Sequence, residues 1–153
     1  MKTLIVYYSR TNVTKGIANK IQNELDCDIE EITDGGKYDG KLGFVKGGMN
    51  ATMGRTSDIS PITKNPADYD LVIIGTPVWA SNMATPVYTY LIQNRDNIKS
   101  MASFCTCMGG GYEEALEKIA DVSGKKQIAT MFLTSNDIEN PSEKINNFIN
   151  KIQ

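Results

Sequence analysis

The sequence predicts an α/β fold in which a doubly wound parallel sheet of five strands lies between two layers of helices. After their first residues, Lys2 and Asp70, the segments 2–8 and 70–75 are mostly apolar or β-branched, which is typical of strands buried on both faces. Strand patterns alternate with helical patterns along the chain, which favours parallel strands joined by helices. No internal repeat or low-complexity linker interrupts this alternation, so we expect one domain over residues 1–153.

The chain begins with a strand over 2–8, and a loop rich in hydroxyl groups follows at 9–14. Residues 14–26 are predicted to form a helix, because apolar residues from Ile17 to Leu25 recur at intervals of four. A buried strand that delivers a polar loop to the start of a helix is how such sheets bind anions.

The next segment combines a strand pattern with a stretch that is hard to interpret. Residues 27–33 alternate apolar and acidic side chains, which indicates a strand near the edge of the sheet. Glycines recur in 37–67, and each would cost a regular helix about 1 kcal/mol. We therefore expect a short, imperfect helix over 41–53 and then a loop through Pro61 and Pro66.

The strand at 70–75 is followed by a predicted loop at 76–81 and then by a helix. Thr85 is the expected N-cap of this helix, with Pro86 at the first helical position, where its missing N–H costs nothing. The buried stripe of the helix should extend to Ile98.

The C-terminal part of the chain continues the alternation. We expect a strand over 101–107, a helix over 112–121 and a last strand over 127–133. Residues 140–143 have the sequence Asn-Pro-Ser-Glu, which resembles a capping box and predicts the start of a final helix.

Composition excludes several classes of function. The net charge is −2 and no basic run stands out, so nucleic acid is not an expected partner. No apolar stretch approaches the roughly 18 residues of a membrane span, and no signal-peptide pattern begins the chain, so we expect a cytoplasmic protein. Histidine is absent, which excludes catalytic triads and zinc sites that depend on imidazole.

The three cysteines, Cys27, Cys105 and Cys107, lack the C-x-x-C spacing of metal and redox motifs. An odd number of cysteines argues against a disulfide framework and fits a reducing compartment. Cys105 and Cys107 end an apolar strand, so we interpret them chiefly as small buried residues, with metal or redox chemistry as the alternative.

Because the strands are predicted to be parallel, the loops that follow them should lie along one edge of the sheet. The first loop offers the hydroxyl groups of Ser9, Thr11 and Thr14 and the amide of Asn12 at a helix start, which suits a phosphate monoester. It is neither a Walker loop nor a dinucleotide fingerprint, because 9–14 contains no glycine. Simple helix capping is the alternative interpretation of these hydroxyl groups.

Two further loops should reach the same edge. The only tryptophan, Trp79, lies beyond a strand end, where a flat indole suits stacking on a planar ring. Residues 109–111 are three consecutive glycines, which either make a turn or let a ligand approach the main chain. Together the three loops predict a site for a planar heterocycle on a phosphorylated tail.

These motifs resemble those of the flavodoxins, in particular the short-chain flavodoxin-like proteins of anaerobic bacteria and archaea. The similarity covers nearly the whole chain and depends on residues 7–14, 43–48, 75–79 and 106–111. Asn12 departs from the family pattern, which usually has glycine there, although asparagine tolerates the left-handed conformation. The resemblance implies the strand order 2-1-3-4-5, with the cofactor where that order reverses.

The resemblance also implies non-covalent FMN, held at its phosphate by 9–14, stacked on Trp79 and met at its polar edge by the other two loops. Asp58, Asp68, Glu113 and Glu114 are candidate acids that would lower the potential of the flavin. The cofactor-binding residues expected from the resemblance are Ser9, Arg10, Thr11, Asn12, Val13, Thr14, Thr76, Pro77, Val78, Trp79, Ala80, Ser81, Thr106, Cys107, Met108, Gly109, Gly110 and Gly111.

The leading hypothesis is a low-potential electron carrier, a monomer or weak dimer, that serves a reductase and an acceptor protein. An FMN-dependent oxidoreductase acting on NAD(P)H, a quinone or a porphyrinogen is the enzymatic alternative, with 37–67 as the possible substrate lid. A phosphoacceptor signalling domain would need acidic residues after the first strand and an aspartate after the third. The sequence has Ser9 and Arg10, and Gly75 and Thr76, at those places instead.

Overall fold

A computed structural model of the chain describes residues 1–35 and 58–153, so the helix predicted over 41–53 lies outside the described residues. The described chain forms a parallel sheet with the strand order β2-β1-β3-β5-β6, and a short strand, β4, pairs antiparallel with β3. Counting the parallel strands alone, this is the order 2-1-3-4-5, and the predicted fold class is confirmed. The elements are β1 (Thr3–Tyr7), α1 (Val13–Leu25), β2 (Asp28–Glu31), a 3₁₀ turn (Pro66–Asp68), β3 (Leu71–Trp79), β4 (Asn82–Met83), α3 (Thr85–Asn94), a 3₁₀ turn (Arg95–Asn97), β5 (Met101–Thr106), α4 (Tyr112–Ser123), β6 (Gln127–Leu133), α5 (Ser135–Glu139) and α6 (Ser142–Ile152).

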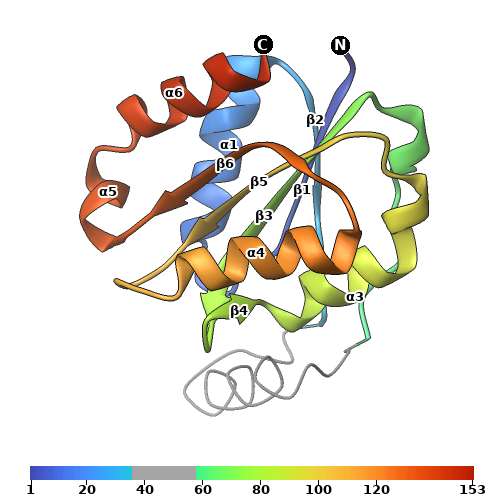
Figure 1. Cartoon of the computed structure of the whole chain (residues 1–153), viewed down its shortest axis with the longest axis horizontal. Helices are drawn as coiled ribbons and strands as arrows, with labels where there is room; N and C mark the ends of the chain where they lie inside the picture. The colour runs from blue at the N-terminus through green and yellow to red at the C-terminus, as the bar shows by residue number, and fades with distance from the viewer. Residues whose placement is uncertain (36–57) are drawn as a thin grey trace.

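Helices cover both faces of the sheet, with α1 and α6 on one side and α3 and α4 on the other (Figure 1). Successive residues of a strand point to opposite faces, so Leu4 packs with the α3 and α4 layer while Ile5 packs with the α1 and α6 layer. Every residue of β1 is buried, which explains why this strand has no alternation of polar and apolar residues.

The edge position predicted for 27–33 is also confirmed, because β2 pairs with β1 and ends the strand order on that side. None of the helices in residues 1–35 and 58–153 is both long and apolar enough to cross a bilayer.

The segment after β3 differs from the prediction. Residues 76–81 were expected as a loop, but β3 continues to Trp79 and turns back into β4 through Ala80 and Ser81. Both turn residues have positive φ, 50° and 59°, as a two-residue hairpin of type I′ requires. Alanine and serine are unusual there, so the sequence gives no signal for this hairpin.

Two predicted helix starts are wrong in detail. Ala84, not Thr85, is the N-cap of α3, and Thr85 is the first helical residue. The expected capping box at 140–143 does not form, because Pro141 is the N-cap of α6 and no side chain caps it. The capping box of this region opens α5 instead, with Thr134 as its N-cap.

Candidate functional site: a cavity at the carboxyl edge of the sheet

A cavity of about 460 Å³ lies at the carboxyl ends of β1, β3, β5 and β6. Its volume is within the range usual for small-molecule and cofactor sites. In Figure 1 the turn before α4, the strand β4 and the helix α5 lie at this same end of the sheet. The residues that line the cavity are Arg10, Thr11, Val13, Thr14, Pro77, Val78, Trp79, Thr106, Cys107, Met108, Ser135 and Ile138.

The first wall is the loop that joins β1 to α1. Asn12 has φ 68° and makes no side-chain capping hydrogen bond, and the first turn of α1 contains no acidic residue. Asn12 thus adopts the left-handed conformation expected at this position, where the family pattern usually has glycine. Val13 and Thr14, the first two residues of α1, line the cavity, so the positive end of the helix dipole faces it.

A hydrogen bond between two buried hydroxyl groups joins this first wall to the end of β5. The Oγ1 atoms of Thr14 and Thr106 are 2.9 Å apart, although the residues are 92 positions apart in the chain. Both threonines line the cavity. The two loops therefore meet at the carboxyl edge of the sheet, as the parallel topology predicted.

The hairpin of β3 and β4 supplies the second wall. Trp79 lines the cavity, but its side chain is only 5% exposed and packs edge-on against Tyr8, with ring centroids 5.5 Å apart. The sequence predicts Trp79 in a loop beyond the end of its strand, but β3 includes Trp79 and the indole belongs to the core. Stacking of this indole on a planar ring stays a prediction.

The glycine loop that precedes α4 is held against this hairpin. Gly111 has φ 80°, and a Cβ atom there would lie 3.0 Å from the Cα atom of Ser81. Gly109 and Gly110 differ, since a Cβ atom at either position would meet no described atom within 4 Å. The described protein thus requires glycine at 111 and leaves open space beside 109 and 110.

A further wall of the cavity, formed by α5, was not predicted. Ser135 and Ile138 of α5 line the cavity, and the Ser135 hydroxyl donates a hydrogen bond to the Met108 carbonyl oxygen at 3.1 Å. A helix of five residues is too short to give a hydrophobic period. The pattern Thr-x-x-Asp at 134–137 was the one available signal, because it is a capping box directly after a strand.

The chemistry of the cavity is amphiphilic. Arg10 is the one charged residue among the described residues that line it. Hydroxyl groups gather near the start of α1, while Val13, Val78 and Met108 provide apolar surface. Such a donor set suits an anionic group at one end and a flat apolar ring at the other, so the residues present fit a phosphorylated flavin.

Ten of the twelve lining residues belong to the predicted set, and eight predicted residues do not line the cavity. Thr76 is completely buried, and its hydroxyl accepts a hydrogen bond from the backbone N–H of Ala84 at 2.9 Å. That hydroxyl joins the hairpin to α3. The other seven, which lie in the same loops as the lining residues, are Ser9, Asn12, Ala80, Ser81, Gly109, Gly110 and Gly111.

The candidate acids are divided between the two ends of the sheet. Glu113 and Glu114 are exposed in the first turn of α4, close to Gly111. Asp58 is also exposed. Asp68, however, lies in the turn that leads into the amino end of β3, so its predicted place near the cavity is wrong.

The cysteines have no metal partners in the part of the chain that the structure describes, where no group of three or more candidate ligands occurs. Burial raises the pKa of Cys105 to about 12, which agrees with its interpretation as a small buried residue. Burial and the nearby Asp137 carboxylate raise the pKa of Cys107, which lines the cavity. Both side chains are therefore thiols at neutral pH.

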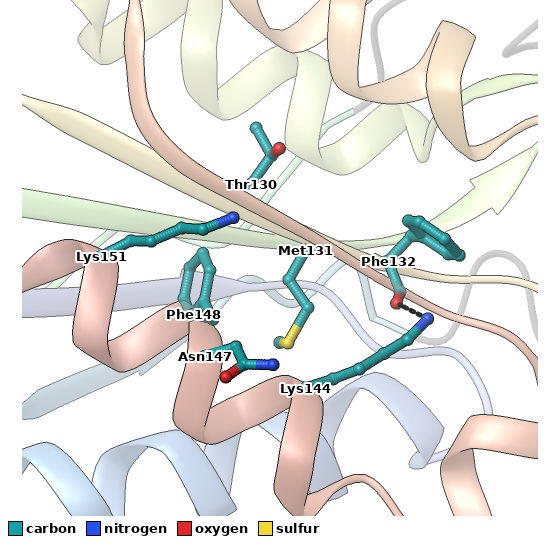
Figure 2. Close-up of a pocket in the computed structure, with 7 residues that line it drawn as sticks. All are labelled: Thr130, Met131, Phe132, Lys144, Asn147, Phe148 and Lys151. Atoms are coloured by element: carbon teal, nitrogen blue, oxygen red, sulfur yellow. Dashed lines mark hydrogen bonds between the residues drawn. The ribbon is translucent and has the colours of Figure 1, made fainter.

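A second, smaller hollow of about 150 Å³ lies between β6 and α6 (Figure 2). Met131 and Phe148 form its floor, and Lys144 and Lys151 lie at its two ends. It is too small for a cofactor. Lys144 nevertheless connects it to the larger cavity through α5.

Comparison with known proteins agrees with this geometry. A model of the flavodoxin family matches residues 2–152. A flavoprotein from Lactobacillus acidophilus, solved in complex with FMN, is 27% identical over 92% of this chain and 98% of its own, with a TM-score of 0.75. Its apo form, solved by NMR, is 26% identical over 91% of this chain and 95% of its own, with a TM-score of 0.65.

A more distant structure shares the fold alone. Oxidised flavodoxin 1 from Bacillus cereus is 18% identical over 98% of each chain, with a TM-score of 0.56. No curated protein matches the chain.

Proposed function

The chain belongs to the flavodoxin family, whose cofactor is FMN, and from this premise we propose that it is an electron carrier that binds FMN in the 460 Å³ cavity. The carrier is proposed to receive electrons from a reductase and to pass them to an acceptor protein. The observation that carries the proposal is the meeting of three distant loops around one amphiphilic cavity, which the Thr14–Thr106 hydrogen bond and the Gly111–Ser81 contact hold together.

The polar end of the cavity is the proposed phosphate site. Thr11 and Thr14 offer hydroxyl groups, Arg10 offers a positive charge, and the start of α1 offers a helix dipole. Lys15 is a less suitable phosphate ligand, because its ammonium group pairs with Glu31 at 3.2 Å.

The apolar part of the cavity is the proposed ring site. Val78 and Trp79 would face the ring from the hairpin, and Met108 would face it from the glycine loop. The bound flavin supplies reversible transfer of one or two electrons, while the protein excludes water and fixes the orientation of the ring.

The carrier role is favoured by the exposure of the cavity edge. Met108 is 84% exposed and Val13 is 41% exposed, and both line the cavity. A flavin seated between them would lie close to the surface, where a partner protein could exchange electrons with it directly.

The first test is the visible spectrum of the purified protein during stepwise reduction. We expect a bound flavin whose oxidised absorbance is lost as reducing equivalents are added. A colourless protein that does not acquire flavin absorbance when mixed with FMN would refute the cofactor site.

The second test separates a carrier from an enzyme. Mixing the FMN-loaded protein with NADH or NADPH in a stopped-flow instrument should bleach the flavin slowly unless a reductase is added. Rapid bleaching without a reductase, or steady turnover with a quinone or porphyrinogen, would favour the FMN-dependent oxidoreductase instead.

A further inference from the structure

The geometry points to Lys144 as a positioning residue of the cofactor site: its ammonium group fixes α5, and α5 forms one wall of the cavity. The inference rests on the proposed function, since it concerns the affinity of the same cavity for flavin. Lys144 lies on α6 and does not line the cavity, and its ion pair with Asp137 links it to α5.

Asp137 is the centre of a small polar cluster at the start of α5. Its Oδ2 atom accepts hydrogen bonds from the backbone N–H of Thr134 at 2.8 Å, from the Thr134 hydroxyl at 3.0 Å, and from the Lys144 ammonium at 2.8 Å. These donors hold the pKa of Asp137 well below its usual range, at about 2. Asp137 is therefore a carboxylate at neutral pH, and Lys144 is the one full positive charge that the described residues bring to it.

Lys144 is itself held by the end of β6. Its ammonium group donates to the Phe132 carbonyl oxygen at 3.0 Å and lies 3.7 Å from the centre of the Phe132 ring. Figure 2 shows this hydrogen bond at one end of the hollow between β6 and α6. The Phe132 ring stacks on Tyr112 of α4, with centroids 3.9 Å apart. The ammonium thus ties the start of α5 to elements of both helical layers.

The position of α5 depends on these polar contacts because the helix has little core of its own. It has five residues, and none of them is buried. Ile138 is only half-buried against the core. On the cavity side, Ser135 donates to the Met108 carbonyl oxygen, so a displacement of α5 would move Ser135, Ile138 and Met108 together.

Removing the ammonium would leave the Asp137 carboxylate with the two Thr134 donors alone and would remove the ion pair between α5 and α6. The side chains of Lys144 and Asp137 are 34% and 26% exposed, so solvent moderates the effect. We expect a loss of about fivefold in flavin affinity, the size appropriate to one partly exposed, charge-assisted contact.

The same helix provides a matched control. Lys151 lies at the other end of the hollow, carries the same charge and is exposed. It makes no ion pair among the described residues. Lys151→Gln therefore removes an equal charge from α6 without touching Asp137.

The experiment titrates the full-length apo protein with FMN and with riboflavin, following flavin fluorescence. The variants are Lys144→Gln, Asp137→Asn, the double variant and Lys151→Gln. Lys144→Gln and Asp137→Asn should each weaken both flavins about fivefold, the double variant should be no weaker than either single one, and Lys151→Gln should stay within about twofold of wild type. The ratio of riboflavin to FMN affinity should not change, because α5 is a side wall and the phosphate loop is untouched.

Three results would overturn the inference: Lys144→Gln binds FMN as wild type does, Lys151→Gln loses as much affinity as Lys144→Gln, or the two single losses add in the double variant. Thermal unfolding of each apo variant shows whether the fold persists, and Asp137→Asn, which keeps an acceptor for Thr134, provides the test if Lys144→Gln does not fold. If wild type itself binds no FMN, the proposed function fails, and the inference fails with it. That outcome differs from wild-type binding with unchanged variants, which refutes the inference alone.

Discussion

Replacing Gly111 by alanine should weaken both the fold and the cofactor site, because this glycine is where the glycine loop rests on the β3–β4 hairpin. Its φ of 80° lies in the left-handed region, which an alanine enters at a cost. The added Cβ atom would lie 3.0 Å from the Cα atom of Ser81 and 3.1 Å from the Cγ1 atom of Val78. The first of these neighbours is backbone and cannot rotate away.

The expected magnitude follows from these two effects. The left-handed conformation costs alanine about 1–2 kcal/mol. Crowding against a packed neighbour adds about 1–3 kcal/mol. Alanine also reduces the conformational entropy of the unfolded chain, which offsets about 0.4–1 kcal/mol of this destabilisation. Gly111→Ala should therefore lower the free energy of unfolding by about 2–4 kcal/mol.

Gly109→Ala and Gly110→Ala are the matched controls in the same loop. A Cβ atom at either position would meet no described atom within 4 Å, and neither residue has a positive φ. The free energy of unfolding of each apo variant should equal the wild-type value within about 0.5 kcal/mol, or exceed it slightly. If the flavin ring approaches this loop closely, both controls should still lose FMN affinity.

The assay combines urea denaturation of the three apo variants, followed by circular dichroism, with titration by FMN. Equal stability of Gly111→Ala and Gly109→Ala would refute the geometry at Gly111. Unchanged FMN affinity in both controls would instead show that the ring does not approach Gly109 and Gly110 closely and that these glycines serve the turn.

Three further perturbations test the contacts around the site. Thr14→Val should cost the apo protein about 1–3 kcal/mol in urea denaturation, because it leaves the buried Thr106 hydroxyl without its partner, whereas Thr14→Ser should restore most of this stability. Replacing Ala80 by asparagine and Ser81 by glycine should raise the free energy of unfolding by about 1 kcal/mol, since these residues suit a type I′ turn; an unchanged urea midpoint would contradict this. The carboxylate of Asp137 stabilises the fold above its ordinary pKa of 3.8, and this contribution should disappear as the pH falls toward about 2. The stability difference between wild type and Asp137→Asn should accordingly shrink between pH 5 and pH 2.5 in acid unfolding experiments, and a constant difference would contradict the assignment.

The strands were predictable because burial determines their composition. The first strand lies between two helical layers, so both of its faces are buried. Its residues are therefore apolar or β-branched, and this composition identifies a buried strand before the fold is known. The last strand was predicted with its observed bounds, Gln127–Leu133. Parallel topology then placed the loops after the strands at one edge, which is why most of the cavity could be predicted.

Two structural features around the cavity could not be predicted, for different physical reasons. Ala80 and Ser81 adopt positive φ angles, which are unfavourable for both residues. Their local propensities therefore oppose the observed turn. The wall formed by α5 is too short for periodicity, and its position depends on Lys144, seven residues beyond Asp137. The burial of Trp79 was not predicted, because it depends on the length of β3 and on the pairing of β3 with β4.

The contacts between loops explain how such a site can be ready before a cofactor arrives. If the loops were not fixed to one another, the ligand would have to order them when it binds. The free-energy cost of that ordering would reduce the affinity of the ligand. Here each loop is fixed to another: Thr14 bonds to Thr106 across 92 positions, Gly111 packs on Ser81, and Ser135 bonds to Met108 across 27 positions. These contacts join protein to protein, so none of them needs an atom of FMN to form. Variants that break them should therefore lower cofactor affinity even when every residue that touches the cofactor is unchanged.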